Sequence, residues 1–318
     1  MARHSIPDII EQAEPRQGDL RTDARPVMWN VIRSLRPQQW TKNLIIFGGL
    51  LFGQRLFDLH SVFYATAAFA VFCALSGVVY LLNDVADRDA DRRHPLKRHR
   101  PIASGDLSAS VALAAAAVIG ISAVSIAFVL RLEFGFFAAA YVGLLALYSG
   151  PLKHVVIVDV LTIAIGFVLR AAAGAAVIDV PISNWLLFIT ILGALFLALS
   201  KRRHELVLLA DEATSHRPIL QEYTPYLLDQ MISVVTASTL VAYAFYTVNA
   251  ETVEKFHTTH LALTLPFLLY GIFRYLYLVH QKEGGGSPAE MLLNDRPLLI
   301  CVALWALAVA LIIYGPLK

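Results

Sequence analysis

Three aspartates, Asp84, Asp87 and Asp91, form the clearest chemical pattern in the sequence because they are spaced by three and four residues. On a helix this spacing aligns the three carboxylates on one face. Such a face repels itself at neutral pH unless a cation lies against it, and Mg²⁺ prefers oxygen ligands of this kind together with phosphates and water. Asn83 adds an amide oxygen one residue before the first carboxylate. We therefore expect these four side chains to bind Mg²⁺; the alternative is a solvated loop whose acids balance its arginines.

Three bases, Lys97, Arg98 and Arg100, follow shortly after the acids. Acids for a metal followed by cations are typical of a site for a metal-bound polyphosphate. The tendency of cytoplasmic loops to be basic could also place these residues here. The sequence leaves both explanations open for each base.

Further ionisable residues lie at the ends of apolar segments or inside them. Tyr148 and Lys153 flank a tight Ser-Gly-Pro-Leu turn, and Asp159 and Arg170 lie in the apolar segment that follows. The last two share a helical face but are separated by about 16 Å along the helix axis. Ionisable residues in such segments usually face a bundle interior or a polar cavity. Substrate binding and a structural ion pair between helices are both compatible with this pattern.

A third charged run, Lys201-Arg202-Arg203-His204-Glu205, directly follows another apolar segment. Long side chains at a membrane boundary that extend their charges into water would explain Lys201 and Arg202 without any ligand. This explanation does not account for Arg203 and Glu205, and we expect them to bind substrate.

The elements that must position these residues are membrane-spanning helices. Of the 318 residues, 57% are hydrophobic and only 16% are charged, whereas soluble proteins have about 25% charged residues. These charges are too few to cover the two soluble domains that a chain of this length would need. Both cysteines, Cys73 and Cys301, lie in apolar runs, so no disulfide framework is expected. The sequence therefore predicts an all-α membrane protein with several spans.

Apolar runs that meet or approach the length needed to cross a bilayer, about 20 residues, predict nine transmembrane helices. We expect them to form a single transmembrane domain over 27–318, packed around a cavity that faces the cytoplasm. Residues 1–26 are polar, and we expect a disordered cytoplasmic tail there. The nine predicted spans are 43–57, 61–82, 108–130, 133–148, 155–178, 183–200, 231–249, 259–280 and 298–315.

Basic residues are distributed unevenly between the two sides of the predicted bundle. With the N-terminus inside, the inner segments contain 20 of the 26 lysines and arginines, and the outer segments contain four. Because Lys and Arg are enriched on the cytoplasmic side of membranes, we predict a cytoplasmic N-terminus and active site and an external C-terminus, in the inner (cell) membrane.

The run from Asn83 to Asp91 and the Arg-Pro-Ile-Ala-Ser-Gly segment at 100–105 resemble the first aspartate motif of the UbiA superfamily of intramembrane prenyltransferases. The resemblance covers about 30–315 and implies a UbiA-like bundle. The usual members of the superfamily carry a second acidic motif on a later inner loop, which helps to bind an isoprenyl diphosphate through a second Mg²⁺. In this sequence the basic run 201–205 takes that place.

This difference resembles one branch of the superfamily, the decaprenyl-phosphate phosphoribosyltransferases, to which segments 36–43, 152–154, 169–171 and 294–296 are also similar. The resemblance implies transfer of 5-phosphoribose from phosphoribosyl pyrophosphate to a polyprenyl phosphate, with Mg²⁺ as the cofactor. The lipid bilayer is the expected surrounding, and no nucleic-acid partner is expected. Both substrates are anionic, which agrees with the replacement of acids by bases in one loop.

The same resemblance assigns roles to the candidate residues. The catalytic residues expected are Asp84, Asp87, Asp91 and Lys153, and the expected Mg²⁺ ligands are Asn83, Asp84, Asp87 and Asp91. The substrate-binding residues expected are Asn83, Lys97, Arg98, Arg100, Tyr148, Asp159, Arg170, Lys201, Arg202, Arg203 and Glu205.

Two alternative functions stay open at this point. One is a UbiA-type prenyltransferase that moves an isoprenyl group from its diphosphate to an aromatic or quinone-precursor acceptor. The other is a transporter or lipid-binding membrane protein. A transporter would spread its polar residues through the spans to the outer face, whereas the polar residues of this sequence gather at the inner ends, which argues against that class.

Overall fold

The computed structural model describes residues 26–95, 97–208, 218–282 and 288–315. Every regular element in these ranges is helical, which confirms the all-α expectation. The expected disordered tail, 1–26, lies outside the described residues except for Pro26.

Eight of the described helices are long and apolar enough to cross a membrane, so the chain is a multi-pass membrane protein. A helix suits this environment because it satisfies its own backbone hydrogen bonds where no water is present. The eight are α3 (Leu59–Ala86), α6 (Ala109–Leu130), α7 (Leu132–Ser149), α8 (Val158–Val177), α9 (Asn184–Leu208), α11 (Pro225–Val248), α13 (Leu265–Gln281, extended at its start by the 3₁₀ helix η5, His260–Thr264) and α15 (Arg296–Tyr314).

Polar side chains mark where several of these helices begin. Asp58, Ser108, Thr224 and Asp295 precede α3, α6, α11 and α15, and each accepts a hydrogen bond from a backbone N–H in the first turn. These N–H groups have no partner inside the helix, so the caps stabilise the helix starts.

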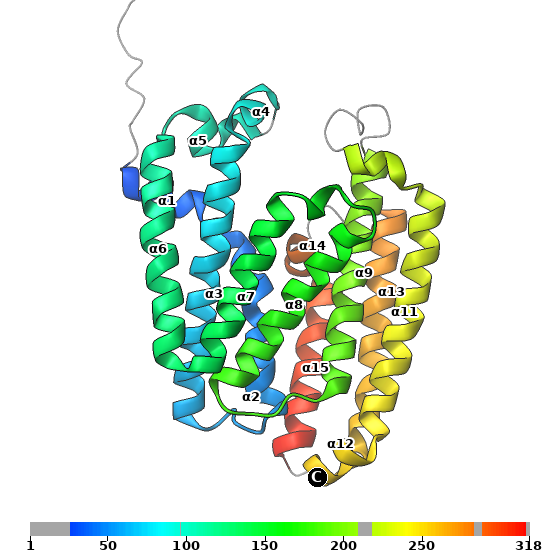
Figure 1. Ribbon diagram of the computed structural model, residues 1–318. Coiled ribbons are helices and arrows are strands. Elements are labelled where there is room, and N and C mark those ends of the chain that lie inside the picture. The colour runs from blue at the N-terminus through cyan, green and yellow to red at the C-terminus, as the bar shows by residue number, and fades with distance from the viewer. Residues whose placement is uncertain (1–25, 96, 209–217, 283–287, 316–318) are drawn as a thin grey trace, which may run out of the picture.

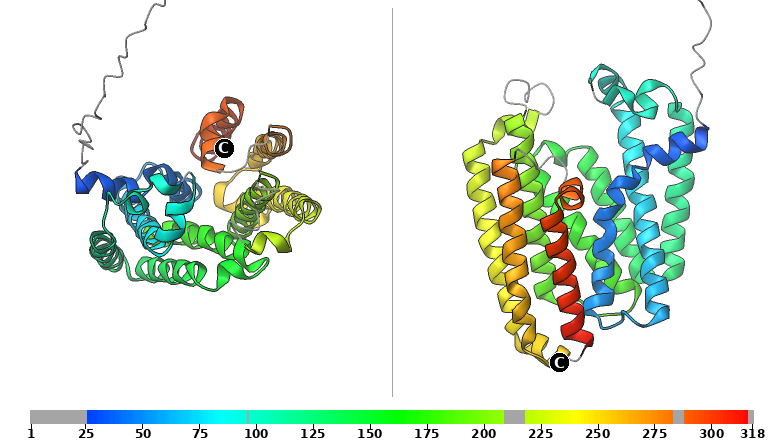
Figure 2. Two further views of the ribbon diagram at one scale, coloured as in Figure 1. Left: turned by 90° about the horizontal axis from the view of Figure 1, so that it is seen from above. Right: turned by 180° about the vertical axis from the view of Figure 1, so that it is seen from behind.

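The first predicted span, 43–57, is not among the eight helices, so nine spanning helices are not confirmed. This part of the chain forms α1 (Val27–Ser34), the 3₁₀ helix η1 (Pro37–Phe47) and the short helix α2 (Gly48–Phe52). Pro37 disfavours an α-helical conformation in the residue before it, and Arg36 has a left-handed backbone with φ 53°. Figure 2 shows these short helices running beside α3 from one end of the bundle toward the other.

The 3₁₀ helix η1 packs closely against α8. A Cβ atom on Gly174 would lie only 2.2 Å from the carbonyl oxygen of Ile46, so this contact requires glycine. Close backbone approach through small residues is how helices commonly associate in membranes. The irregular N-terminal segment is therefore a packed part of the bundle.

Helices that follow one another in the chain are also neighbours in space. The packed pairs include α3 with α6, α6 with α7, α7 with α8, α8 with α9, α9 with α11, α11 with α13, and α13 with α15. Seen from above, the helices form a curved row, with α15 and the short helix α14 (Pro288–Asn294) lying across from α7 and α8 (Figure 2).

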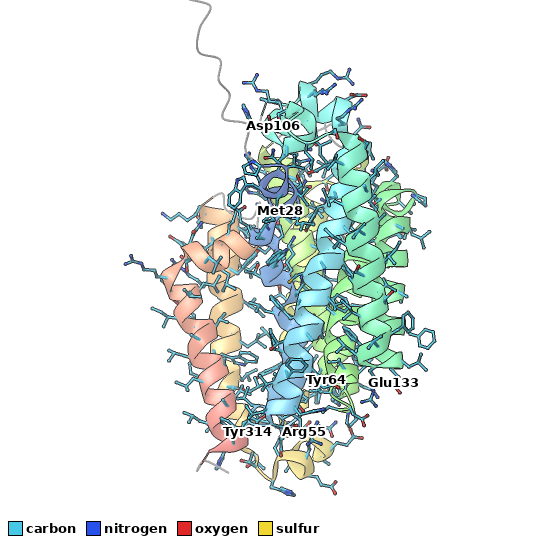
Figure 3. All side chains as sticks on the ribbon, turned by 90° about the vertical axis from the view of Figure 1, so that its left-hand side faces the viewer. Met28, Arg55, Tyr64, Asp106, Glu133 and Tyr314 are labelled. Carbon is cyan, nitrogen blue, oxygen red and sulfur yellow. The ribbon has the colours of Figure 1, made fainter. Side chains whose placement is uncertain are left out.

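One end of the bundle carries the charged segments, and we call it the α4–α5 end after α4 (Arg88–Arg93) and α5 (Pro101–Ser104) (Figure 1). The short 3₁₀ helix η2 (Lys97–His99) lies between these two helices in the chain. Asp106 lies toward this end, whereas Arg55, Glu133 and Tyr314 lie toward the opposite end (Figure 3). The end of α9, which carries the run 201–205, is also at the α4–α5 end (Figure 1).

Candidate active site

Two of the predicted metal-binding aspartates are joined by one arginine, Arg100, at the α4–α5 end. Asp84, in the last turn of α3, and Asp91, in α4, are both buried. The Nη1 atom of Arg100 lies 3.1 Å from Asp84 Oδ1 and 2.6 Å from Asp91 Oδ2. The Nη2 atom of Arg36 lies 2.5 Å from the same Asp84 oxygen. We call Asp84, Asp91, Arg36 and Arg100 the first cluster.

The other two predicted metal ligands are less enclosed. The helix α3 ends at Ala86, Asp87 forms its C-terminal cap, and α4 begins at Arg88. Hydrogen bonds from Asp87 N to Asn83 O and from Asp91 N to Asp87 O, both 2.8 Å, continue the helical repeat across this junction. Asp87 is nevertheless exposed, and Asn83 is half-buried. The structure thus joins two of the three carboxylates and leaves the third facing outward.

Local backbone geometry explains how Arg100 reaches both acids. Arg100 precedes Pro101 and has an extended conformation (φ −68°, ψ 142°), as expected for a residue before proline, and α5 starts immediately after it. The other two bases of this segment, Lys97 and Arg98, lie on η2 and are exposed.

The first cluster suits a hard cation. In the described part of the chain, no three His, Cys, Asp or Glu side chains are close enough together to hold a metal ion. Asp84 and Asp91 nevertheless direct carboxylate oxygens at a single cationic nitrogen, Arg100 Nη1. Two converging carboxylates are the protein ligands that Mg²⁺ commonly uses beside a substrate phosphate. The donor chemistry therefore fits this metal.

A second cluster surrounds Arg202, a fully enclosed arginine near the end of α9. Its Nε atom donates to Asp159 Oδ2 (2.8 Å), its Nη1 to Glu205 Oε2 (2.6 Å) and its Nη2 to Tyr148 Oη (3.3 Å). Tyr223 donates from its hydroxyl to Asp159 Oδ1 at 2.9 Å. We call these five residues the second cluster.

Tyr223 also holds the start of α8. The Ile157 N–H donates to the Tyr223 hydroxyl at 2.7 Å, and Ile157 has a left-handed backbone with φ 69° directly before the helix. Burial raises the pKa of Tyr223 to about 12, and its hydrogen bond to Asp159 adds to this rise. The hydroxyl therefore stays protonated at neutral pH and keeps donating to Asp159.

The three successive bases of α9 do not share one partner. Lys201 and Arg202 both contact Glu205, Lys201 at 3.7 Å from Oε1 and Arg202 at 2.6 Å from Oε2. Arg203 turns to Asp229 on α11, with its Nε atom 2.5 Å from Asp229 Oδ1, and His280 contacts the same oxygen at 3.2 Å. Each of these bases contacts a carboxylate on the protein itself.

Asp159 and Arg170 have different partners, and neither pairs with the other. Arg170 is buried in the middle of α8, where its Nη2 donates to Tyr141 Oη at 2.7 Å and its Nη1 to Gly166 O at 3.3 Å. The Tyr141 hydroxyl in turn lies 3.0 Å from Ser76 Oγ on α3. Lys153, on η3 (Leu152–His154), is half-buried in the α7–α8 connection.

Three contacts of the candidate site are not visible in the local spacing of the sequence. Arg36 reaches Asp84 from a position 48 residues earlier, Tyr223 reaches Asp159 from 64 residues later, and Tyr141 reaches Arg170 from 29 residues earlier. Of these, Arg36 alone had a sequence signal, because it begins the Arg-Pro segment at 36–43 that resembles the phosphoribosyltransferase branch.

Comparison with known proteins gives a consistent result. The model of the UbiA prenyltransferase family matches residues 44–295. The decaprenyl-phosphate phosphoribosyltransferase of Mycolicibacterium smegmatis is 30% identical over 96% of this chain and 98% of its own length. That of Corynebacterium glutamicum is 29% identical over 89% of this chain and 86% of its own length.

Solved structures agree at the level of the fold. A UbiA homolog from Archaeoglobus fulgidus, solved with GPP and Mg²⁺, superposes with a TM-score of 0.68 at 18% sequence identity, covering 89% of this chain and 99% of that one. Since the family model covers most of the chain and a relative is similar over nearly its whole length, this chain belongs to the UbiA prenyltransferase family.

Proposed function

We propose that this protein is a membrane phosphoribosyltransferase that moves 5-phosphoribose from phosphoribosyl pyrophosphate to a polyprenyl phosphate and releases pyrophosphate. The observation that carries the proposal is the nearly full-length similarity to relatives named decaprenyl-phosphate phosphoribosyltransferase. Bases at the α4–α5 end support it, because the donor carries a pyrophosphate and a 5-phosphate and the acceptor carries a further phosphate.

The first cluster is the proposed site for the donor pyrophosphate. Asn83, Asp84, Asp87 and Asp91 would hold Mg²⁺. When bound, this metal would neutralise charge on the leaving pyrophosphate. In the structure Arg36 and Arg100 neutralise the buried acids. Their side chains are each more than a quarter exposed, so both can bind phosphate oxygens of the donor in place of a carboxylate.

The reaction requires little further chemistry from the protein. The C1–O bond of the donor breaks, and its electron pair leaves with pyrophosphate. An oxygen of the acceptor phosphate forms the new bond to C1 from the opposite face, with inversion. Because this oxygen is already anionic, no general base is required. Lys153 and Arg98 would stabilise the developing negative charge.

Within the run 201–205, we assign substrate binding to the partly exposed bases and a structural role to Arg202. Arg202 is enclosed by the second cluster and would act by holding α9 in place, whereas Lys201 and Arg203 lie partly exposed at the same end. Arg203 would then bind either the 5-phosphate or the acceptor phosphate through guanidinium N–H groups.

A transfer assay tests the proposed function directly. Purified protein is incubated with Mg²⁺, phosphoribosyl pyrophosphate labelled in the ribose, and polyprenyl phosphate. We expect label in the lipid fraction and release of pyrophosphate, with neither observed when Mg²⁺ is removed by a chelator. Transfer of an isoprenyl group to an aromatic acid, without transfer of phosphoribose, would instead establish the prenyltransferase alternative.

The proposed orientation places the α4–α5 end in the cytoplasm, in an inner (cell) membrane. After Cys73 and Cys301 are replaced by serine, single cysteines are introduced by Ser104→Cys and Thr259→Cys, both at exposed positions. An impermeant thiol reagent is expected to label the first only in inverted vesicles and the second only in right-side-out vesicles. Labelling in the reverse pattern would contradict the orientation.

A further inference from the structure

The middle of the bundle contains basic residues that the first and second clusters do not explain. The 3₁₀ helix η1, which carries Lys42, packs against both α3 and α8 (Figure 2). The adjacent residue, Asn43, donates from its side chain to Cys73 Sγ on α3 at 3.3 Å and is completely buried. Lys42 is thereby held at the level of Cys73, inside the bundle.

Positive charges gather at this level without matching carboxylates. The charges of Arg170 and Arg36 both act on the Lys42 ammonium, which is partly buried. Arg170 is bound by the Tyr141 hydroxyl, and its guanidinium also lies 4.8 Å from the Tyr141 and Phe167 ring centres. Within the described ranges, none of the ion pairs involves Lys42 or Arg170, and Arg36 alone of the three has an acid, Asp84.

Holding the positive charges of Lys42 and Arg170 inside the bundle costs free energy unless an anion is bound there. A buried charge that lacks a partner of opposite sign loses its hydration without compensation. Arg170 is only 8% exposed, and its Nε atom has no hydrogen-bond partner in the structure. The buried Oδ1 atom of Asn43 and Nε1 atom of Trp40, on η1 beside Lys42, are likewise unpartnered. Buried polar groups normally have a hydrogen-bond partner in the protein or in bound water, so these atoms are available to a ligand.

Lys42 and Arg170 lie deeper in the bundle than the first cluster. Tyr141 contacts Ser76, which is eight residues before Asp84 on α3, so Arg170 lies about 12 Å further along the helix axis. Tyr80 lies between the two levels, and the Arg36 guanidinium is 4.6 Å from its ring centre. Arg36 therefore connects the acids at the end of α3 to the basic group inside.

We propose that Lys42 and Arg170, with Arg36 beside them, form a subsite that binds a phosphate monoester inside the helix bundle. The inference rests on the proposed function, in which both substrates carry a phosphate monoester: the 5-phosphate of the donor and the phosphate of the lipid acceptor. The ammonium and the guanidinium supply charge-assisted hydrogen bonds, and the phosphate dianion supplies the missing negative charge. Pyrophosphate would occupy the first cluster at the same time.

Direct binding to the full-length protein in nanodiscs tests this subsite and identifies the source of the phosphate. Ribose 5-phosphate stands for the donor end without its pyrophosphate, and farnesyl phosphate stands for the acceptor. We expect Lys42→Gln to weaken binding of at least one probe by roughly 10- to 150-fold and Lys42→Arg to preserve most of it. Lys282→Gln, which removes an exposed lysine elsewhere, is the matched control. The probe whose Kd rises identifies the substrate that supplies the phosphate.

A second measurement needs no variant and covers the case in which Lys42→Gln does not fold. In the wild-type protein, ribose 5-phosphate or farnesyl phosphate is expected to slow acylation of Lys42 by an amine reagent while leaving Lys282 unaffected. The inference is wrong if neither probe protects Lys42 and the Kd values of folded Lys42→Gln stay within twofold of wild type. This outcome differs from failure of the proposed function, which shows as absence of phosphoribose transfer by the wild-type protein.

Discussion

The first and second clusters both join acids to arginines at the α4–α5 end, but they differ in how completely the arginine is enclosed. In the first, the side chains of Arg36 and Arg100 are 29% and 28% exposed around a buried Asp84. In the second, the side chains of Arg202 and Asp159 are 2% and 0% exposed, and two tyrosines satisfy their remaining polar atoms. We expect the partly exposed arginines of the first cluster to exchange a carboxylate for a ligand when Mg²⁺ takes over the buried acids, whereas Arg202 cannot leave Asp159 without stranding a buried charge.

This difference suggests that similar residues serve different purposes. The first cluster joins segments close to the end of α3, where a substrate anion could replace one partner of each arginine. The second joins α7, α8, α9 and the segment before α11 through Tyr148, Asp159, Arg202 and Tyr223. Loss of a partner should therefore lower turnover most in the first cluster and the unfolding free energy most in the second.

The largest expected effect is on stability and comes from the second cluster. Arg202→Met leaves Asp159 buried without its cation, which is expected to cost about 3–5 kcal/mol of unfolding free energy. The matched change in the first cluster, Arg36→Met, leaves Arg100 on both Asp84 and Asp91 and is expected to cost about 1.5 kcal/mol. Reversible unfolding in detergent micelles measures both. Equal losses in the two variants would contradict the proposed division between the clusters.

The next largest effect is on turnover and comes from the first cluster. Asp84→Asn removes a buried carboxylate from the proposed metal site, and we expect turnover to fall by about 100-fold or more with little change in stability. Asp89→Asn is the control, because Asp89 contacts Arg88 and Arg92 and its side chain is 72% exposed. Steady-state assays at saturating substrate compare the two. Similar losses at Asp84 and Asp89 would remove the basis for the metal site.

Asp87, which is exposed in the structure, tests whether the metal site extends beyond the buried acids of the first cluster. If Asp87 is a metal ligand, Asp87→Asn should lower turnover as much as Asp84→Asn and should raise the Mg²⁺ concentration needed for half-maximal activity. Activity close to that of the wild type would restrict the metal site to Asp84 and Asp91 with Asn83.

A smaller effect is expected at Arg203, which belongs to neither cluster. Arg203→Ala is expected to raise the KM for phosphoribosyl pyrophosphate or polyprenyl phosphate by roughly 10- to 150-fold, as for a lost charge-assisted hydrogen bond. Asp229→Asn removes the acid that holds Arg203 but keeps the guanidinium, so its KM values should stay close to those of the wild type. If both variants raise KM equally, Arg203 acts only through its contact with Asp229.

Much of the architecture could be predicted because spanning helices are defined by composition. Eight of the nine predicted apolar runs correspond to long helices, since a long apolar run and a helical backbone are what the membrane requires. The exception, 43–57, is also apolar, but η1 and the short α2 replace a single long α-helix there. Hydropathy depends on composition alone, so it cannot show that Arg36–Pro37 starts η1 or that η1 packs on Gly174.

The partners of the site residues could not be predicted because they come from distant parts of the chain. Local spacing correctly places Asp84 and Asp91 near each other, since they are two helical turns apart. It also places Asp159 and Arg170 on one face of α8, but their partners are Arg202 on α9 and Tyr141 on α7. Only the packing of the helices decides which charges meet.

The smallest expected effect comes from Tyr223, at the edge of the second cluster. Tyr223→Phe removes one hydrogen bond to Asp159 and leaves the Ile157 N–H without its acceptor, which is expected to cost about 1 kcal/mol of unfolding free energy. Because Arg202 still neutralises Asp159, the loss should be well below that of Arg202→Met.

The pH dependence of the stability that Tyr223 contributes gives a further check. The pKa of Tyr223 rises from 10 to about 12 on folding, so the folded state holds this proton more tightly. The stability contributed by Tyr223 is therefore fully present below about pH 10 and is lost as the pH rises through about 12. The unfolding free energy of the wild type minus that of Tyr223→Phe should shrink across this range. A difference that stays constant between pH 9 and 12 would show that folding does not raise the pKa of the Tyr223 hydroxyl, which contradicts its burial beside Asp159 in the second cluster.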